Sequence, residues 1–334
     1  MRQTNISVFV PFSGCPHRCT FCDQRSISGT QAPPSADEVR ELLKGQVDTL
    51  RRNGMCAEIA FFGGSFTGID RGYMRSLLEA AHSFVRKFPD VYNGIRCSTR
   101  PDFIDAEVLD ILEEYGMTAV ELGAQSMNAK VLRLNERGHS PEEVERAAAM
   151  IRERGFSLGL QMMTGLYGDK PEYCVDTAER FIAMKADTVR IYPTVILEGT
   201  KLGELYRRGE YSSFTFDETV ELCAKLLRLF DSAGIPVIRL GLHASTEVEA
   251  KRLGGVYHPA LREIAESRSF YEDMLAEMKR LGGHRFVVCT DPKNISKVIG
   301  QKKENRIKLE RLGFTFRTEN EKGTRLRIYA LQDT

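Results

Sequence analysis

The stretch "ISVFVPFSGCPHRCTFCDQ" (residues 6–24) joins a short apolar run directly to a loop that carries three cysteines. The run at residues 6–10 is rich in β-branched and aromatic side chains, which is typical of a buried strand. Cys15, Cys19 and Cys22 follow this run and together span eight residues. Packing explains three thiols at this spacing poorly, whereas clustered thiolates bind metal. The stretch therefore predicts a strand that ends at a metal-binding loop.

The residues alone leave the kind of metal site open. Three thiolates on one loop can hold an iron–sulfur cluster. A structural zinc ion needs a fourth protein ligand, and only His17 stands near enough in the sequence to offer one. A zinc site completed by a distant Cys or His, and three buried thiols without metal, are the alternatives. A metal left short of protein ligands has an open coordination position, as in catalytic zinc centres.

Composition excludes several broad classes of protein. The chain has 334 residues, 42% of them hydrophobic, and a net charge of +1, so it can bury a large core and is not polybasic overall. The N-terminus is a poor signal peptide, and no apolar run is long enough to span a membrane. Eight cysteines in a chain of this length do not form a disulfide scaffold. These features predict a cytoplasmic protein without a membrane partner.

Seven β-rich apolar runs alternate with helical patterns. They cover residues 6–10, 58–64, 94–99, 118–126, 157–165, 188–194 and 236–242. Two intervening helices begin with capping-box pairs, Ser35 with Glu38 and Ser140 with Glu143. The alternation predicts an α/β fold in which parallel strands form a barrel or partial barrel. In such barrels the active site lies at the C-terminal ends of the strands, where the cysteine loop is expected.

The pattern changes near Gly282 and Gly283. From there the sequence predicts a compact β-α-α-β-β unit. We therefore expect two domains, at residues 1–282 and 283–334.

The spacing Cys15-x3-Cys19-x2-Cys22 after a first strand, with "FFGGSF" (residues 61–66) ending the second, resembles the radical S-adenosylmethionine (SAM) superfamily. The resemblance implies a partial (βα)6-type radical SAM barrel. It implies that the three cysteines bind three irons of a [4Fe–4S] cluster and that SAM binds the fourth. It also implies an enzyme that reductively cleaves SAM to a 5′-deoxyadenosyl radical, served by an electron donor such as flavodoxin or ferredoxin.

The same resemblance assigns residues to SAM binding, but it assigns none to catalysis. Phe21 matches the aromatic residue beside the adenine. The glycine motif matches backbone contacts to the methionine amine, with Ser65 where many members carry an acid. Gln125 and Arg137 match ribose and carboxylate contacts of the coproporphyrinogen dehydrogenase branch. The full set is Phe21, Gly63, Gly64, Ser65, Ser98, Thr99, Gln125, Arg137 and Gln161.

Three further strings, "TRPDFID" (99–105), "VELGAQS" (120–126) and "VRIYPTVILEGTKLGELYRRGEY" (189–211), resemble the radical SAM core of the elongator catalytic subunit, which modifies the wobble uridine of tRNA. Here the cysteine spacing is shorter, and nothing resembles that subunit's acetyltransferase domain. The resemblance implies tRNA modification. A radical SAM oxidoreductase acting on a small molecule such as a porphyrinogen, and a non-catalytic metal-binding RNA protein, are the alternatives.

The string "NISKVIGQKKENRIKLERLG" (294–313) resembles the helix–loop–helix of a KH domain, which clamps nucleotide backbone with a Gly-x-x-Gly loop. The second glycine is replaced by Lys303. This resemblance implies that the C-terminal domain is a small basic, KH-like α/β unit. Its candidate RNA-binding residues are Lys297, Lys302, Lys303 and Arg306.

Overall fold

A computed structural model of the chain describes residues 2–11, 14–15, 19–23 and 32–331. The chain forms two compact units. The first comprises Met1–Ser213 with Ile235–Gly255, and the second comprises Phe214–Gly234 with Val256–Thr334.

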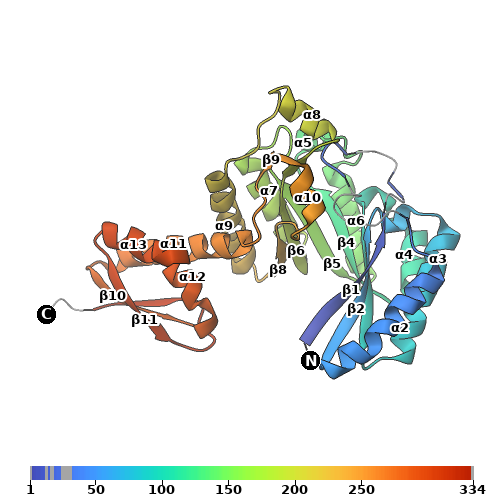
Figure 1. Cartoon of the computed structure of the whole chain (residues 1–334), viewed down its shortest axis with the longest axis horizontal. Coiled ribbons are helices and arrows are strands. Elements are labelled where there is room, and N and C mark those ends of the chain that lie inside the picture. Colours follow the sequence, from blue (N-terminus) through green and yellow to red (C-terminus); the bar gives the residue numbers. More distant parts are fainter. Residues whose placement is uncertain (1, 12–13, 16–18, 24–31, 332–334) are drawn as a thin grey trace. The chain divides into compact units, whose positions relative to one another are not determined.

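The first unit is built on one parallel sheet whose strands follow the order β1-β2-β3-β4-β5-β6-β8 (Figure 1). The strands are β1 (Arg2–Val10), β2 (Met55–Gly63), β3 (Tyr92–Thr99), β4 (Met117–Gln125), β5 (Ser157–Thr164), β6 (Thr188–Pro193) and β8 (Val237–Leu240). All seven predicted strands are present, and neighbouring pairs run parallel throughout. The sheet curls into a partial barrel, which confirms the predicted fold class. Because the strands are parallel, their C-terminal ends meet at one edge.

Amphipathic helices connect these strands and cover the sheet. They are α2 (Ala36–Arg52), α3 (Arg71–Lys87), α4 (Ala106–Glu114), α5 (Ala129–Leu134), α6 (Pro141–Glu153), α7 (Pro171–Ala183), α8 (Lys201–Arg207) and α10 (Thr246–Lys251). A two-stranded ribbon of β7 (Val195–Leu197) and β9 (Arg252–Gly255) completes the unit. Both predicted capping boxes are confirmed, at Ser35 of α2 and Ser140 of α6.

The alternation of side chains along β4 shows how the sheet separates core from site. Val120 and Leu122 are fully buried and belong to the apolar core. Glu121, Gly123 and Gln125 lie on the opposite face, because successive strand residues point to opposite sides, and all three line a cavity. The apolar residues therefore hold the sheet against its helices, while the polar residues between them face the interior of the barrel.

The second unit packs helices on a three-stranded sheet. Its elements are α9 (Phe216–Ser232), α11 (Leu261–Leu281), β10 (Arg285–Thr290), α12 (Ile295–Ile299), α13 (Glu304–Arg311), β11 (Thr315–Asn320) and β12 (Arg327–Ala330). The predicted β-α-α-β-β order is present, with β10 parallel to β11 and antiparallel to β12. Whether this unit is KH-like stays a prediction.

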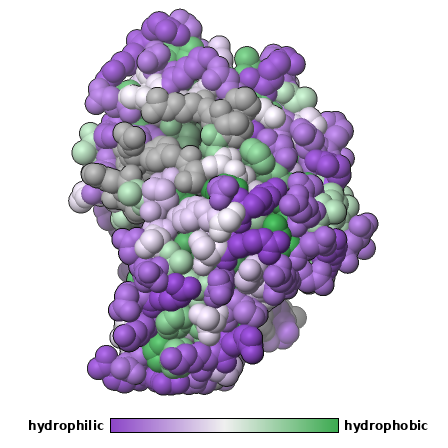
Figure 2. Space-filling model, turned by 90° about the vertical axis from the view of Figure 1, so that its right-hand side faces the viewer, coloured by the Kyte–Doolittle hydropathy of each residue, from purple (hydrophilic) through white to green (hydrophobic). Residues whose placement is uncertain are grey.

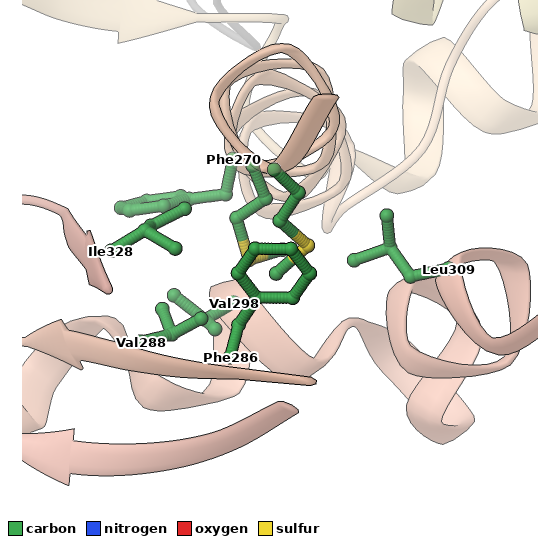
Figure 3. Packing of buried hydrophobic residues seen from close by; sticks show 8 residues of the cluster. Phe270, Phe286, Val288, Val298, Leu309 and Ile328 are labelled. Carbon is green, nitrogen blue, oxygen red and sulfur yellow. The ribbon is translucent and has the colours of Figure 1, made fainter. Parts of the chain in front are cut away.

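The core of this unit crosses the domain junction that the sequence predicts at residue 282. Phe270, Met274 and Met278 of α11 pack with Phe286 and Val288 of β10 in one buried cluster (Figure 3). Helix α11 thus contributes to the same core as the strands that follow it. The compact unit begins well before residue 283, because a three-stranded sheet needs a long helix to cover its apolar face.

Among the residues that the structure describes, few large apolar side chains are exposed. The face drawn in Figure 2 is mainly hydrophilic, with hydrophobic residues in small separate patches. In the part of the chain that the structure describes, no helix is both long and apolar enough to cross a membrane.

Candidate SAM and iron–sulfur site

A cavity of about 370 Å³ opens in the first unit at the C-terminal ends of the strands. Its volume is within the range of small-molecule sites. Most of the predicted site residues that the structure describes line it. They are Cys15, Phe21, Cys22, Gly63, Gly64, Ser98, Thr99, Gln125, Arg137 and Gln161. Residues from six separate segments of the sequence therefore meet in one place.

Glycine contacts hold the cysteine loop against the turn that follows β2. Gly14 has φ +74°, a left-handed conformation that glycine adopts most readily. A Cβ atom on Gly14 would lie 2.2 Å from the Ser65 carbonyl oxygen, and one on Gly68 would lie 2.5 Å from the Gly14 carbonyl oxygen. The two backbones touch directly, and this contact sets the position of Cys15.

The other end of the loop is anchored through Asn135, which is fully buried at the end of α5. The Thr20 hydroxyl donates to Asn135 Oδ1 at 2.9 Å, and the Thr20 amide donates to the Asn135 carbonyl at 3.2 Å. Asn135 Nδ2 in turn donates to the carbonyl of Tyr167 at 2.9 Å. Phe21 lies against the apolar cluster formed by Ile196, Leu202, Leu205 and Tyr211.

The thiols of the loop influence one another and lie near positive charge. Burial, with the neighbouring Cys19, raises the pKa of Cys15, while Arg100 and Arg137 act to lower that pKa. Burial, with Cys19 and Cys15, raises the pKa of Cys22 to about 12. Without metal, Cys15 and Cys22 therefore keep their protons at neutral pH, and metal binding must release them.

The donor set suits an iron–sulfur cluster. Cys15 and Cys22 line one cavity, and Arg137 Nη1 donates to the sulfur of the third cysteine, Cys19, at 3.1 Å. Within the described ranges, no three Cys, His, Asp or Glu side chains are close enough to bind a single metal ion. His17, the nearby alternative ligand considered for zinc, lies outside the described residues.

Hydroxyl groups fix the strand ends beside the glycine turn. Ser65 and Thr99 are buried, and their hydroxyl oxygens are 2.8 Å apart. Thr99 also contacts the Thr67 hydroxyl at 2.6 Å, and the Arg100 amide donates to Ser65 Oγ at 3.1 Å. The Ser65 side chain therefore ties β2 to β3. Gly63 and Gly64 present backbone to the cavity, as the glycine motif implies.

Gln125 and Arg137 are twelve residues apart in sequence but meet over Gly123. A Cβ atom on Gly123 would lie 2.9 Å from Gln125 Nε2 and 3.6 Å from Arg137 Nη2. Arg137 Nη2 donates to the Gly123 carbonyl at 2.6 Å. Gln125 has φ +68°, a conformation that costs a non-glycine residue on the order of 1 kcal/mol and is common at functional sites. A side chain at position 123 would therefore press on the amide end of Gln125.

A buried ion network forms the floor of the cavity. Glu121 accepts from Arg96 Nη2 at 2.8 Å and from Arg190 Nε at 2.6 Å. Gln161 Nε2 donates to Glu121 Oε2 at 3.3 Å and to Ser98 Oγ at 3.2 Å. Gln161, predicted as a SAM contact, is thus held by Glu121. Tyr192 and His243 also line this cavity.

His139 is a buried histidine next to this site, and its Nε2 lies 3.1 Å from the Ala124 carbonyl. Burial, with the positive charge of Arg137, lowers its pKa to about 3. In the unfolded chain His139 has an ordinary pKa near 6.5. Between that pH and about pH 3 the histidine is therefore protonated in the unfolded chain and neutral in the folded chain. Stability from this residue is therefore complete above pH 6.5 and is lost as pH falls toward 3.

We expect a pH-dependent loss of stability that His139→Gln removes. Between about pH 7 and pH 5 the wild type should lose about 2 kcal/mol through this group, at about 1.4 kcal/mol per pH unit. Urea unfolding of the metal-free protein across this range measures it. His284→Gln, which changes an exposed histidine, is the control and should keep the wild-type pH dependence. Equal slopes in wild type and His139→Gln would contradict the prediction.

The predicted RNA-binding residues of the second unit differ in their surroundings. Lys297 Nζ lies 2.6 Å from Glu266, and the Arg306 guanidinium lies over the Phe316 ring at 5.1 Å. Lys302 and Lys303 are exposed and have φ +50° and +65°. The two loop lysines are therefore the members of the set whose side chains extend into solvent. Their role in RNA binding stays a prediction.

Family comparisons agree with this geometry. The family model described as the Radical SAM superfamily matches residues 9–181, and the model described as the Radical_SAM C-terminal domain matches residues 186–270. The chain is 27% identical over 252 residues to Elongator complex protein 3 of Saccharomyces cerevisiae, a match that covers 67% of this chain and 45% of that protein. It is 32% identical over 254 residues to tRNA uridine(34) acetyltransferase of Methanocaldococcus infernus, covering 65% and 48% respectively. The chain spans about half the length of these two relatives.

A solved structure shares the fold. The archaeal Methanocaldococcus infernus Elp3 with an N-terminal deletion superposes with a TM-score of 0.62 at 20% identity. The match covers 83% of this chain and 64% of that one. At this identity the likeness supports the architecture of the barrel.

Proposed function

This chain belongs to the radical SAM superfamily, and on that premise we propose that it is an enzyme that modifies RNA, with tRNA as its substrate class. Enzymes of this superfamily use a [4Fe–4S] cluster and SAM. When bound, this pair supplies a 5′-deoxyadenosyl radical by reductive cleavage of SAM. Membership in a superfamily of enzymes also disfavours the alternative of a non-catalytic metal-binding protein.

The observation that carries the proposal is the shared cavity. Cys15 and Cys22 line it together with Gln125 and Arg137, so a cofactor at the thiols would touch the groups that are assigned to SAM. We propose that Cys15, Cys19 and Cys22 hold the cluster. We further propose that SAM contacts Phe21, Gly63, Gly64, Ser98, Thr99, Gln125, Arg137 and Gln161, with Ser65 acting through its backbone.

Two further polar side chains of the cavity, Tyr192 and His243, are our proposed substrate contacts. Neither belongs to the set that is assigned to SAM. Burial raises the pKa of Tyr192 and lowers the pKa of His243, the latter helped by Arg239. Both groups are therefore neutral at physiological pH, and each can form hydrogen bonds with a polar substrate without adding charge.

RNA is favoured as substrate by two lines of support. Relatives that match about two thirds of the chain are named for a tRNA uridine, although the chain spans about half of their length. The second unit also presents the exposed loop lysines Lys302 and Lys303, and paired cations contribute to phosphate binding in a salt-dependent way.

Nucleoside mass spectrometry of tRNA from cells with and without the gene tests the proposal. We expect at least one modified nucleoside to disappear and to return with the wild-type gene. Complementation with Lys302→Glu/Lys303→Glu should return it only partly. Lys225→Glu/Lys279→Glu, the same charge change at exposed lysines of α9 and α11, is the matched control and should restore it fully. An unchanged tRNA profile would favour the small-molecule alternative.

A further inference from the structure

Arg100, which the sequence analysis did not select, is a buried arginine beside the cysteine loop. It is 3% exposed, and it lines the cavity together with Cys15 and Cys22. Its Nη1 atom is buried and has no hydrogen-bond partner among the described residues. A buried charged donor left without an acceptor costs several kcal/mol, so such groups usually have a partner when the protein is complete.

The remaining atoms of Arg100 are fully engaged and fix its direction. Nε and Nη2 donate to the two carboxylate oxygens of Asp102 at 2.9 and 2.8 Å. The Arg100 amide donates to Ser65 Oγ, which ties the residue to the glycine turn. A two-point ion pair on a tied backbone leaves a guanidinium little freedom to turn elsewhere. The free Nη1 donor is therefore held in a set direction and is not a mobile side chain.

Arg137 is a second buried arginine beside the cysteine loop. Its Nη1 donates to Cys19 Sγ at 3.1 Å, and its own Nε is buried without a partner in the described residues. Two guanidinium groups thus lie at the three-cysteine loop, one held by Asp102 and the other by the Gly123 carbonyl. Thiolates buried in a protein require nearby positive charge or metal, and these two arginines supply the charge.

We propose that Arg100 is an electrostatic partner of the iron–sulfur cluster: its Nη1 faces the group that the three cysteines hold, and its charge stabilises the reduced state of that group. Reduction adds negative charge, which a buried cation nearby favours. Asp102 opposes this effect in part and keeps the guanidinium in place. The inference uses the superfamily's cluster and does not depend on whether the substrate is RNA.

Redox titration of the anaerobically reconstituted full chain, followed by electron paramagnetic resonance without SAM, tests this role. Arg100→Gln should shift the reduction equilibrium at least tenfold toward the oxidised cluster, which equals about 59 mV for one electron. Asp102→Asn should shift it in the opposite direction, because it leaves the guanidinium charge unbalanced. A purely structural Arg100–Asp102 pair would instead give two shifts of the same sign, or none.

Arg71→Gln is the matched control. Its guanidinium donates to the Thr67 carbonyl near the same turn, but the side chain is 39% exposed, so solvent screens its charge. It should keep the wild-type potential. Iron and sulfide content, measured for every variant, shows whether the cluster is complete, and Asp102→Asn keeps the test decisive if Arg100→Gln loads poorly. Unchanged potentials, equal signs, or shifts seen only after SAM is added would each overturn the proposal.

Discussion

Replacing Gly14 by alanine is expected to abolish binding of the [4Fe–4S] cluster while the barrel still folds. The new Cβ would lie 2.2 Å from the Ser65 carbonyl oxygen and 2.7 Å from the Gly68 carbonyl carbon, and both are backbone atoms that cannot rotate away. The left-handed φ of +74° adds about 1 kcal/mol of strain. The loop must move off the glycine turn, and Cys15 moves with it.

Iron and acid-labile sulfide, measured after anaerobic reconstitution, should fall to a small fraction of the wild-type values, and circular dichroism should stay close to wild type. Gly155→Ala is the control. Gly155 has nearly the same φ, +77°, but no atom lies within 4 Å of its Cβ position. It should lose about 1 kcal/mol of stability and keep its cluster. Full cluster content in Gly14→Ala would show that the loop does not need this backbone contact.

The strands of the barrel were predictable because their sequence patterns are local. Each of the seven runs is apolar, β-rich and followed by a helical pattern, and each forms a parallel strand. The helix starts were equally local, since Ser35 and Glu38 complete their capping box within one turn. The extent of the second unit was not predictable in this way. Helix α11 joins the core of β10 through contacts that amphipathic periodicity does not specify.

Site residues that belong to a sequence motif were predicted. Residues that reach the site only through tertiary packing were not. The cysteine spacing and the glycine turn indicated Cys15, Cys22, Gly63 and Gly64, all of which line the cavity. Asn135 was missed because its role depends on contacts to Thr20 and Tyr167, which are far apart in sequence. Arg100 was missed although it follows Ser98 and Thr99 directly. An arginine two residues before an aspartate at a strand end was the available signal, but its burial is visible only in the structure.

Glu121→Gln is expected to destabilise the first unit by about 3–5 kcal/mol, as is typical when one member of a buried ion pair is removed. Glu121 is 1% exposed and pairs with both Arg96 and Arg190. Arg96 keeps Glu58, at 2.8 Å, but Arg190 loses the carboxylate that both its Nε and Nη2 contact. The amide cannot balance a buried guanidinium, so the cost is that of leaving charge uncompensated in a protein interior.

Urea unfolding of the metal-free protein measures the loss, and Glu114→Gln is the matched control. Glu114 pairs with Arg75 at 2.7 Å, but both side chains are about half exposed, so its removal should cost less than about 1 kcal/mol. The two ion pairs have similar N–O distances, so a difference between the two Glu→Gln substitutions reports the effect of burial on stability. A loss below 1 kcal/mol for Glu121→Gln would mean that water in the cavity solvates Arg190. Arg190 would then be available to a substrate as a hydrated cation and would no longer serve as a fixed part of the cavity floor.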